Sequence, residues 1–327
     1  MLVFAPSLAT VQRINSALES KGALHSDGRP SLRATPRELV SILLDIDSRC
    51  FVIPAHAWTP WFGIYGSKSG FDSLEECFGD TWEHVPAIET GLSSDPAMNW
   101  MVPELDDRAI VSFSDAHSLP RMGRELTYFN GELSYDGLLS SLRTQDIAYT
   151  IEFFPEEWKY HHSGHRKCGV SLSPAEVAEG GGRCPKCGRR LTLGVLQRVH
   201  ELGRREVETR VDEEGFTRSV DGRPPFRSMV ALDLIVAESL GVGVKTKMVR
   251  TTYGKLIAEL GGEMSVLMEA TTDDIARVAG DRVAEGVYRV RRGQVQIEPG
   301  YDGRYGTVKI WGGKGRGRKA SGAKVLH

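Results

Sequence analysis

Four potential metal ligands occur in two pairs with matching spacing near the middle of the chain. In each pair two residues separate the ligands, and a glycine follows the second. Fifteen residues lie between the pairs, which suits a small zinc ribbon. Three thiolates and one imidazole complete a tetrahedral Zn²⁺ shell and leave no position for a substrate. The sequence therefore predicts a structural zinc site, with the ligands His165, Cys168, Cys184 and Cys187.

Neighbouring residues leave some choice at this site. His161 and His162 are alternatives to His165 for the fourth ligand, although neither has the matching spacing. The other interpretation is three unrelated thiols. Five cysteines, three of them clustered, fit a reducing compartment and a metal site better than a disulfide framework. With no long apolar run and no basic leader, the sequence predicts a cytoplasmic protein.

Charge is distributed unevenly along the chain, whose formal net charge is −2. Residues 166–205 carry nine Lys/Arg and three Glu, and residues 303–327 carry seven Lys/Arg and no acid. Two basic segments on an otherwise acidic chain indicate a polyanionic partner such as DNA. Solvated surface followed by a disordered tail explains the same charges equally well.

Short apolar strands alternate with helical patterns in the first half of the chain. Ser7 and Thr35 are expected to cap two helices, the second through a capping box with Glu38. This alternation predicts an α/β fold with a parallel sheet, open or closed as a barrel. About five strands are visible, fewer than a closed barrel needs, so either the sheet is open or the chain begins partway through a domain. The expected strands are 2–5, 50–54, 86–90, 109–114 and 147–153.

The remaining sequence divides by composition. Residues 1–150 are assigned to an α/β domain, 151–206 to a zinc-binding domain, and 207–311 to a helical domain with a short β end. Residues 312–327 are rich in Gly, Lys and Arg and are expected to be a basic disordered tail. The helical pattern of the third segment is expected from about residue 223.

Polar side chains follow three of the expected strands at their carboxyl ends. His56 follows the second strand, Glu89 ends the third, and Asp115 and His117 follow the fourth. Active sites of parallel α/β folds are built at these ends. Carboxylate and imidazole are competent ligands for zinc or manganese. The four residues are therefore candidate ligands of a catalytic metal centre, while separate structural roles remain an alternative.

Three lysines are candidate DNA contacts. Lys68 lies in an aromatic, glycine-rich loop after His56, and Lys245 and Lys247 lie at an expected helix end. The loop could stack a base or simply be pinned by its aromatic residues. No Gly-x-x-x-x-Gly-Lys-Ser/Thr occurs in the sequence, which argues against a P-loop ATPase.

Several of these motifs together resemble the later metal-binding motifs of the endonuclease Q family. The resemblance rests on residues 54–63 (PAHAWTPWFG), 89–95 (ETGLSSD) and 114–118 (SDAHS). Residues 164–188 resemble the zinc domain of that family, and residues 241–303 its helical part. The family belongs to the PHP (polymerase and histidinol phosphatase) superfamily. By resemblance, residues 1–150 would be part of a distorted (β/α)₇ barrel, with His56, Glu89, Asp115 and His117 as ligands.

The resemblance also implies an activity. Family members nick DNA on the 5′ side of uracil, hypoxanthine and abasic sites, so the expected partner is damaged DNA and the expected catalytic cofactors are divalent Zn²⁺, Mn²⁺ or Mg²⁺. A flipped base would enter a protein pocket. The His-x-His motif that opens the family barrel has no counterpart here, so the sequence is expected to be N-terminally truncated.

Two other functions are consistent with the sequence. One is a non-catalytic DNA-binding zinc protein with a degenerate phosphoesterase barrel. The other is a helicase-associated protein, of the kind labelled UvrD, without ATPase motifs.

Overall fold

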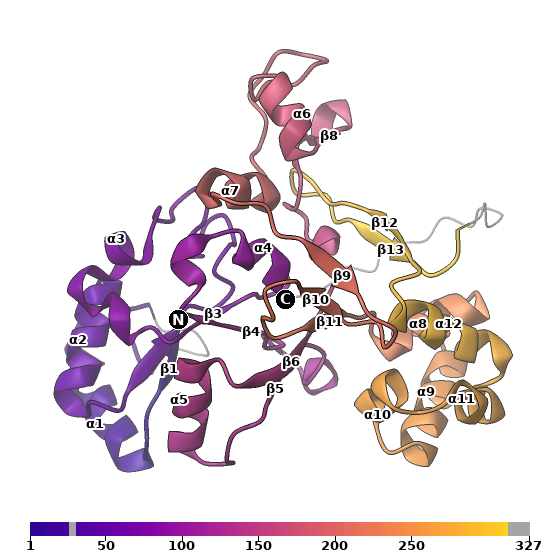
Figure 1. Ribbon diagram of the computed structural model, residues 1–327, viewed down its shortest axis with the longest axis horizontal. Coiled ribbons are helices and arrows are strands. Elements are labelled where there is room, and N and C mark those ends of the chain that lie inside the picture. Colours follow the sequence, from indigo (N-terminus) through magenta and orange to yellow (C-terminus); the bar gives the residue numbers. More distant parts are fainter. Residues whose placement is uncertain (26–30, 313–327) are drawn as a thin grey trace.

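The computed structural model describes residues 1–25 and 31–312. Of the predicted basic tail, residues 313–327 lie outside the described residues. Figure 1 shows the first half of the chain as strands flanked by helices, a small module around α6 (Pro174–Glu179) projecting from it, and a separate cluster of helices α8 to α12 (residues 232–291). The observed fold is therefore a mixed α/β structure with a helical region.

Local capping signals fix the first two helices. The Ser7 hydroxyl accepts the Thr10 N–H at 3.1 Å and starts α1 (Leu8–Leu18). At α2 (Pro36–Ile46), the Thr35 hydroxyl accepts the Glu38 N–H at 3.2 Å, and the Glu38 carboxylate accepts the Thr35 N–H at 2.7 Å. Both predicted helix starts are confirmed, because each cap depends on two residues only three apart in the sequence.

The first four strands occupy the expected positions but pair in two ways. β3 (Ala87–Glu89) and β4 (Ala109–Val111) are parallel, as predicted. β1 (Leu2–Phe4) and β2 (Phe51–Ile53) are antiparallel, so the predicted parallel arrangement is wrong for this pair. Two helices, α1 and α2, connect β1 to β2 and pack against each other. A single helix between two strands returns the chain for a parallel strand, whereas a second helix turns the chain once more, so β2 runs antiparallel to β1.

A five-stranded sheet joins distant parts of the chain. Its order is β5 (Leu126–Phe129), β6 (Ile147–Glu152), β11 (Phe226–Ser228), β10 (Thr217–Ser219) and β9 (Thr209–Val211). β11 lies parallel to β6, and the other neighbours are antiparallel. Strands β9 to β11 fall in the segment assigned to the helical domain, so the expected helix near residue 223 is wrong and the helices begin at Leu232. Figure 1 shows this sheet between the first half of the chain and the helices.

The helical region has its own core. Buried residues of α8, α9 and α12, such as Ile235, Leu256 and Val287, pack together, and Ile151 of β6 joins them. A hairpin follows, in agreement with the short β end expected for this segment. No helix within residues 1–25 and 31–312 combines the length and apolar character that a bilayer span requires. The bounds are α8 Leu232–Leu240, α9 Lys247–Glu259, α10 Glu263–Met268, α11 Thr272–Ala279, α12 Asp281–Arg291, β12 Gln296–Glu298 and β13 Thr307–Lys309.

The elements not yet placed are short and connect the larger ones. In the first half they are α3 Leu74–Phe78, α4 Pro96–Trp100 and α5 Tyr135–Thr144. In and beside the projecting module they are β7 Ser163–His165, β8 Val170–Leu172 and α7 Val195–Leu202.

Candidate active site and metal centre

The carboxyl ends of β2, β3 and β4 bring three of the predicted ligands into one neighbourhood. The Glu89 side chain, at the end of β3, accepts the backbone N–H of His56, and the Glu89 carbonyl accepts the Ala57 N–H at 3.1 Å. The charge of Asp115, after β4, acts on the Glu89 carboxyl. The His117 ring Nδ1 lies 2.7 Å from the Asp115 carbonyl oxygen. The three strand ends therefore bring His56, Glu89 and Asp115 near one another, with His117 beside Asp115, while their role as metal ligands stays a prediction.

The backbone at this edge is strained. His56, Leu92 and Asp115 have φ values of 38°, 55° and 43°, in the left-handed region that non-glycine residues rarely adopt. Gly91 has φ of 51°, and a Cβ on it would lie 2.5 Å from the His56 Cα. Such strain costs about 1–3 kcal/mol per residue and is concentrated at functional sites. The tight turns hold the loops after β2 and β3 against each other.

Glu89 is the most perturbed of the predicted ligands. Glu89 is 2% exposed, and burial raises the pKa of its carboxyl to about 7. The charge of Asp115 raises this pKa further, whereas hydrogen bonds from backbone N–H groups lower it. Its Oε1 atom has no hydrogen-bond partner among the described residues. A buried carboxylate oxygen without a partner is costly, and a bound cation would supply what is missing.

The four predicted catalytic ligands do not form a compact ligand set in this structure. Asp115 and His117 are exposed, His56 is half-buried and Glu89 is buried. Among the described residues, a different group is the one whose ligand atoms converge closely enough to hold an ion. A catalytic metal at His56, Glu89, Asp115 and His117 therefore stays a prediction.

Two further buried acids lie at the same edge and were missed by sequence reasoning. Glu125 precedes β5 and Glu152 ends β6, which places them opposite each other across the antiparallel pair. Burial raises the pKa of both, to about 8 for Glu152, and each is affected by other acids nearby. Glu125 accepts the Phe153 N–H at 3.0 Å. The hydroxyl of Thr90, the residue after Glu89, donates to Glu152 at 2.8 Å. The sequence signal is Glu152 at the end of an apolar strand.

The predicted zinc ligands do converge. Their ligand atoms all lie within 4.8 Å of one another, and the residues are His165, Cys168, Cys184 and Cys187. The His165 ring Nδ1 is 3.3 Å from the Cys187 sulfur. Gly169 and Gly188 follow the second ligand of each pair with φ of 64° and 71°, in the left-handed region that glycine adopts without strain. Three sulfurs and one imidazole nitrogen fit a tetrahedral soft or borderline ion such as Zn²⁺.

Local hydrogen bonds prepare one thiol for metal binding. Burial opposes ionisation of Cys184, but backbone N–H groups of Lys186 and Cys187 outweigh it and lower the pKa of this thiol to about 6. Contact with the Cys187 thiol raises the pKa of Cys168 to about 11 in the absence of an ion. A metal would replace this thiol–thiol contact and take both sulfurs as thiolates.

The rival histidines lie outside the cluster. His161 is buried, and burial lowers the pKa of its ring to about 3. The His162 ring Nδ1 is 3.3 Å from the Ser171 hydroxyl. Neither belongs to the convergent group, so the choice between the three histidines falls on His165.

We call residues 162–192, which carry the four predicted zinc ligands, the metal module. A loop around Asp302 holds this module in place. The Asp302 carboxylate accepts the Arg166 backbone N–H at 2.6 Å and the Thr192 hydroxyl at 2.7 Å. The His162 N–H donates to the Gly300 carbonyl at 2.9 Å. Asp302 itself has φ of 44°. The module therefore contacts residues far away in the sequence and is held by polar contacts on both sides of the metal cluster.

The predicted DNA-contacting lysines are exposed and far apart along the chain. Lys68 lies in the loop after β2, and its N–H donates to the Pro60 carbonyl at 2.9 Å. Lys245 and Lys247 lie at the start of α9, within the helical cluster of Figure 1. The role of all three lysines in DNA binding stays a prediction.

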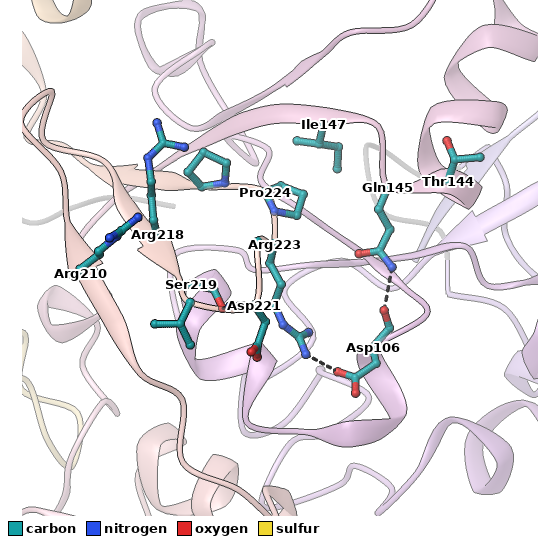
Figure 2. A pocket seen from close by; sticks show the side chains of 13 residues that line it. Asp106, Thr144, Gln145, Ile147, Arg210, Arg218, Ser219, Asp221, Arg223 and Pro224 are labelled. Carbon is teal, nitrogen blue, oxygen red and sulfur yellow. Dashed lines mark hydrogen bonds and ion pairs between the residues drawn. The ribbon is translucent and has the colours of Figure 1, made fainter.

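A polar cavity of about 690 Å³ opens at the other end of the strands. Asp106, Gln145 and Arg223, which line it, precede β4, β6 and β11 (Figure 2). Hydrogen bonds from Arg205 and Arg223 lower the pKa of Asp106 to about 2. The Arg223 guanidinium lies 2.8 Å from the Asp106 carboxylate. Because this cavity lies at the amino ends of the strands, it is distinct from the edge that carries Glu89 and Asp115.

The chain is similar to a family model and to two proteins from other organisms. The family model of the MJ0043 C-terminal domain matches residues 231–294, which span α8 to α12. The chain is 31% identical over 263 residues to MJ0043 of Methanocaldococcus jannaschii, covering 78% of this chain and 31% of that protein. It is 30% identical over 314 residues to YqxK of Bacillus subtilis, covering 94% of this chain and 73% of YqxK. The chain thus spans about a third of one relative and most of the other.

Two solved structures are also similar. The crystal structure of the lesion-specific endonuclease PfuEndoQ from Pyrococcus furiosus has a TM-score of 0.80 and 27% identity, covering 94% of this chain and 74% of that one. A structure of endonuclease Q with a 27-mer duplex substrate carrying an abasic lesion at the active site has a TM-score of 0.78 and 28% identity, covering 94% and 75%.

Proposed function

This chain belongs to the endonuclease Q family, and we propose that it is a DNA repair endonuclease that nicks the strand on the 5′ side of a deaminated base or an abasic site. The observation that carries the proposal is the edge formed by the loops after β2, β3 and β4. There His56, Glu89 and Asp115 meet on strained turns. The endonuclease Q structures support the assignment because their likeness extends over 94% of this chain.

The residues at this edge have the chemistry that phosphodiester cleavage requires. His56, Glu89, Asp115 and His117 would hold one or more divalent ions, Zn²⁺, Mn²⁺ or Mg²⁺, which would supply an activated water and neutralise the phosphate. The unpartnered Oε1 of Glu89 is the feature of the described residues that best fits such an ion. We further propose that residues 1–150 form part of a PHP-type barrel.

The chain's own groups would have separate roles. The turn at Gly91 and the left-handed backbone of Asp115 fix the directions of the ligand-bearing loops. Thr90 and Ser112 donate to Glu152 and to the Ile151 carbonyl at 2.8 and 3.0 Å and tie β3 and β4 to β6. A substrate held against this rigid edge would have its damaged base flipped out of the stack, since the pairing edge that distinguishes a damaged base is hidden inside the duplex. The His/Cys cluster would hold a structural Zn²⁺ that stabilises the neighbouring module.

A nicking assay tests the proposal. With Mn²⁺ or Mg²⁺ we expect cleavage 5′ of uracil, hypoxanthine or an abasic site in an end-labelled duplex, and no cleavage of the undamaged duplex. Asp115→Asn should lower the rate of nicking by about a hundredfold or more, because the predicted metal ligand loses its charge. Asp45→Asn, which changes an exposed carboxylate on α2, should nick like the wild type. Equal nicking of damaged and undamaged DNA would refute the repair assignment.

A second candidate function is non-catalytic DNA binding by the metal module and its neighbours. It is favoured by one observation: within the described residues the His/Cys group is the one compact ligand set. Lesion-dependent DNA binding without nicking, in every divalent metal tested, would favour this candidate over the nuclease.

A further inference from the structure

Aromatic rings and basic side chains from three distant segments form a continuous strip on the surface. The Trp61 ring, in the loop after β2, meets the Tyr160 ring edge-on at 5.1 Å. The Lys159 ammonium lies 5.7 Å from the centroids of both Tyr160 and Tyr305. It also lies 5.4 Å from the Trp158 ring. We call Trp61, Phe62, Lys159, Tyr160 and Tyr305 the aromatic strip.

The strip is exposed in a way that folding does not require. Phe62 is 86% exposed, Trp61 45% and Tyr305 39%. Exposed aromatic residues that adjoin one another mark binding surfaces more often than isolated ones do. The cation–π contacts of Lys159 favour a position of its ammonium group between the rings of Tyr160 and Tyr305.

Charge around the strip is predominantly positive. Arg166 and Arg304 are exposed beside it, and Gly303, between Tyr305 and the metal module, donates its N–H to the Lys159 carbonyl at 2.9 Å. Three acids lie nearby. Asp302 already accepts two hydrogen bonds from the metal module, and burial raises the pKa of the Glu156 and Glu157 carboxyls, which favours their uncharged forms. An acidic or polyanionic partner therefore fits the strip better than a cationic one.

One end of the strip shares a loop with the proposed active edge. Trp61 and Phe62 belong to the same loop as His56, and this loop packs against β3 through the Ala57 N–H and the Glu89 carbonyl. At its other end the strip reaches Tyr305, next to the turn whose Asp302 holds the metal module. A ligand lying along the strip would thus run from the Glu89 neighbourhood toward the His/Cys cluster.

Resting on the proposed function, we propose that the aromatic strip binds unpaired DNA bases by stacking and guides the strand beside the lesion. Ring faces stack on any base, and a lysine between rings neutralises the backbone that joins the bases. Bases in a duplex hide their faces from such rings, so the occupant is a single-stranded segment opened next to the lesion. No side chain of the strip presents the paired donor and acceptor groups that base-edge recognition needs, so binding should be tolerant of sequence.

Fluorescence anisotropy with a labelled single-stranded oligonucleotide tests the strip in the absence of added divalent metal. The full chain carrying Asp115→Asn is used, so that no cleavage intervenes. Tyr305→Ala and Phe62→Ala should each weaken binding roughly 5- to 150-fold, the range for the loss of one base–aromatic stack. Tyr305→Phe keeps the ring and should bind like the parent. Tyr288→Ala on α12 removes an equally exposed tyrosine, 42% exposed with Arg292 5.6 Å from its ring, and should have no effect.

A second oligonucleotide separates stacking from charge. A strand of the same length built of abasic sugar-phosphates keeps the phosphates and lacks the bases. Tyr305→Ala should bind this strand as tightly as the parent does. Equal affinity of the parent and the two alanine variants for the base-containing strand would overturn the proposal, as would strip-dependent binding of a proline-rich peptide in place of DNA. Nicking is measured separately with Asp115 intact, so that strip-dependent binding without nicking refutes the proposed function alone.

Discussion

Replacing Glu152 with glutamine should change how stability depends on pH. Glu152 is fully buried, and burial raises the pKa of its carboxyl from 4.5 to about 8, against hydrogen bonds from Thr150, Thr90 and Ser112 that favour the charged form. The folded protein therefore keeps a proton that the unfolded chain releases between these two pH values. Because unfolding then releases a proton, the free energy of unfolding falls as pH rises from 4.5 toward 8.

The structure gives the size of the effect. The interval from 4.5 to about 8, at 1.36 kcal/mol per pH unit, corresponds to a loss of about 5 kcal/mol on going from acidic to mildly alkaline pH. Glutamine has nearly the same shape but does not titrate in this range. Thr90 and Thr150 donate to different oxygens of Glu152, so the glutamine carbonyl oxygen can accept one of these hydroxyls, and its amide group can donate to the other once that hydroxyl rotates. Glu152→Gln should therefore match the wild type near pH 5 and exceed its stability by up to about 5 kcal/mol at pH 8–9.

Urea unfolding followed by circular dichroism at pH 5, 7 and 9 measures this difference. Glu89, Asp95 and Glu157, whose pKa values burial raises to about 7, push the wild-type curve in the same direction. They remain in the variant, so the difference between the two proteins isolates Glu152 and the acids coupled to it. Glu132→Gln, at an exposed position, should follow the wild type. Parallel pH profiles for wild type and Glu152→Gln would refute the reasoning.

Three more tests, one of them with a control substitution, address other parts of the molecule. Cys184→Ser should abolish tight Zn²⁺ binding, measured as metal per chain by mass spectrometry after gel filtration, whereas His162→Ala should retain it, because His162 lies outside the ligand group. Thr35→Ala removes the capping box of α2 and should cost about 1 kcal/mol in urea unfolding. The Arg291 guanidinium donates to the carbonyls of Val266, Leu267 and Ala270, at the end of α10. Arg291→Met removes these three hydrogen bonds and should lower the free energy of unfolding by about 3 kcal/mol in the same assay. An unchanged urea midpoint would contradict this stabilising role.

Features that depend on neighbours in sequence could be predicted. The Thr35 capping box and the two ligand pairs around the metal are each set within a few residues, so their geometry follows from spacing alone. One longer-range feature was also predictable: His56 and Glu89 lie together because α/β folds gather the carboxyl ends of neighbouring strands at one edge, whichever strands pair.

Features that depend on pairing between distant segments could not be predicted. β11 is three residues long and carries a charged side chain, Arg227, at a position that burial would ordinarily make apolar. Its guanidinium lies 4.1 Å from the Phe216 ring, a contact that exists only after β10 and β11 have paired. The opposed acids Glu125 and Glu152 were missed for the same reason, since nothing in the local sequence brings them together.

The seating of the metal module by Asp302 has a consequence for the order of events during synthesis. All four metal ligands have been made once Cys187 is synthesised, so the module can bind its ion early. Asp302, which accepts hydrogen bonds from Arg166 and Thr192, is synthesised much later. At about 5–20 residues per second, the 115 residues from Cys187 to Asp302 take roughly 6–23 seconds. For that time a nascent chain would carry a metal-loaded module without its anchor, exposed to chaperones and to competing partners.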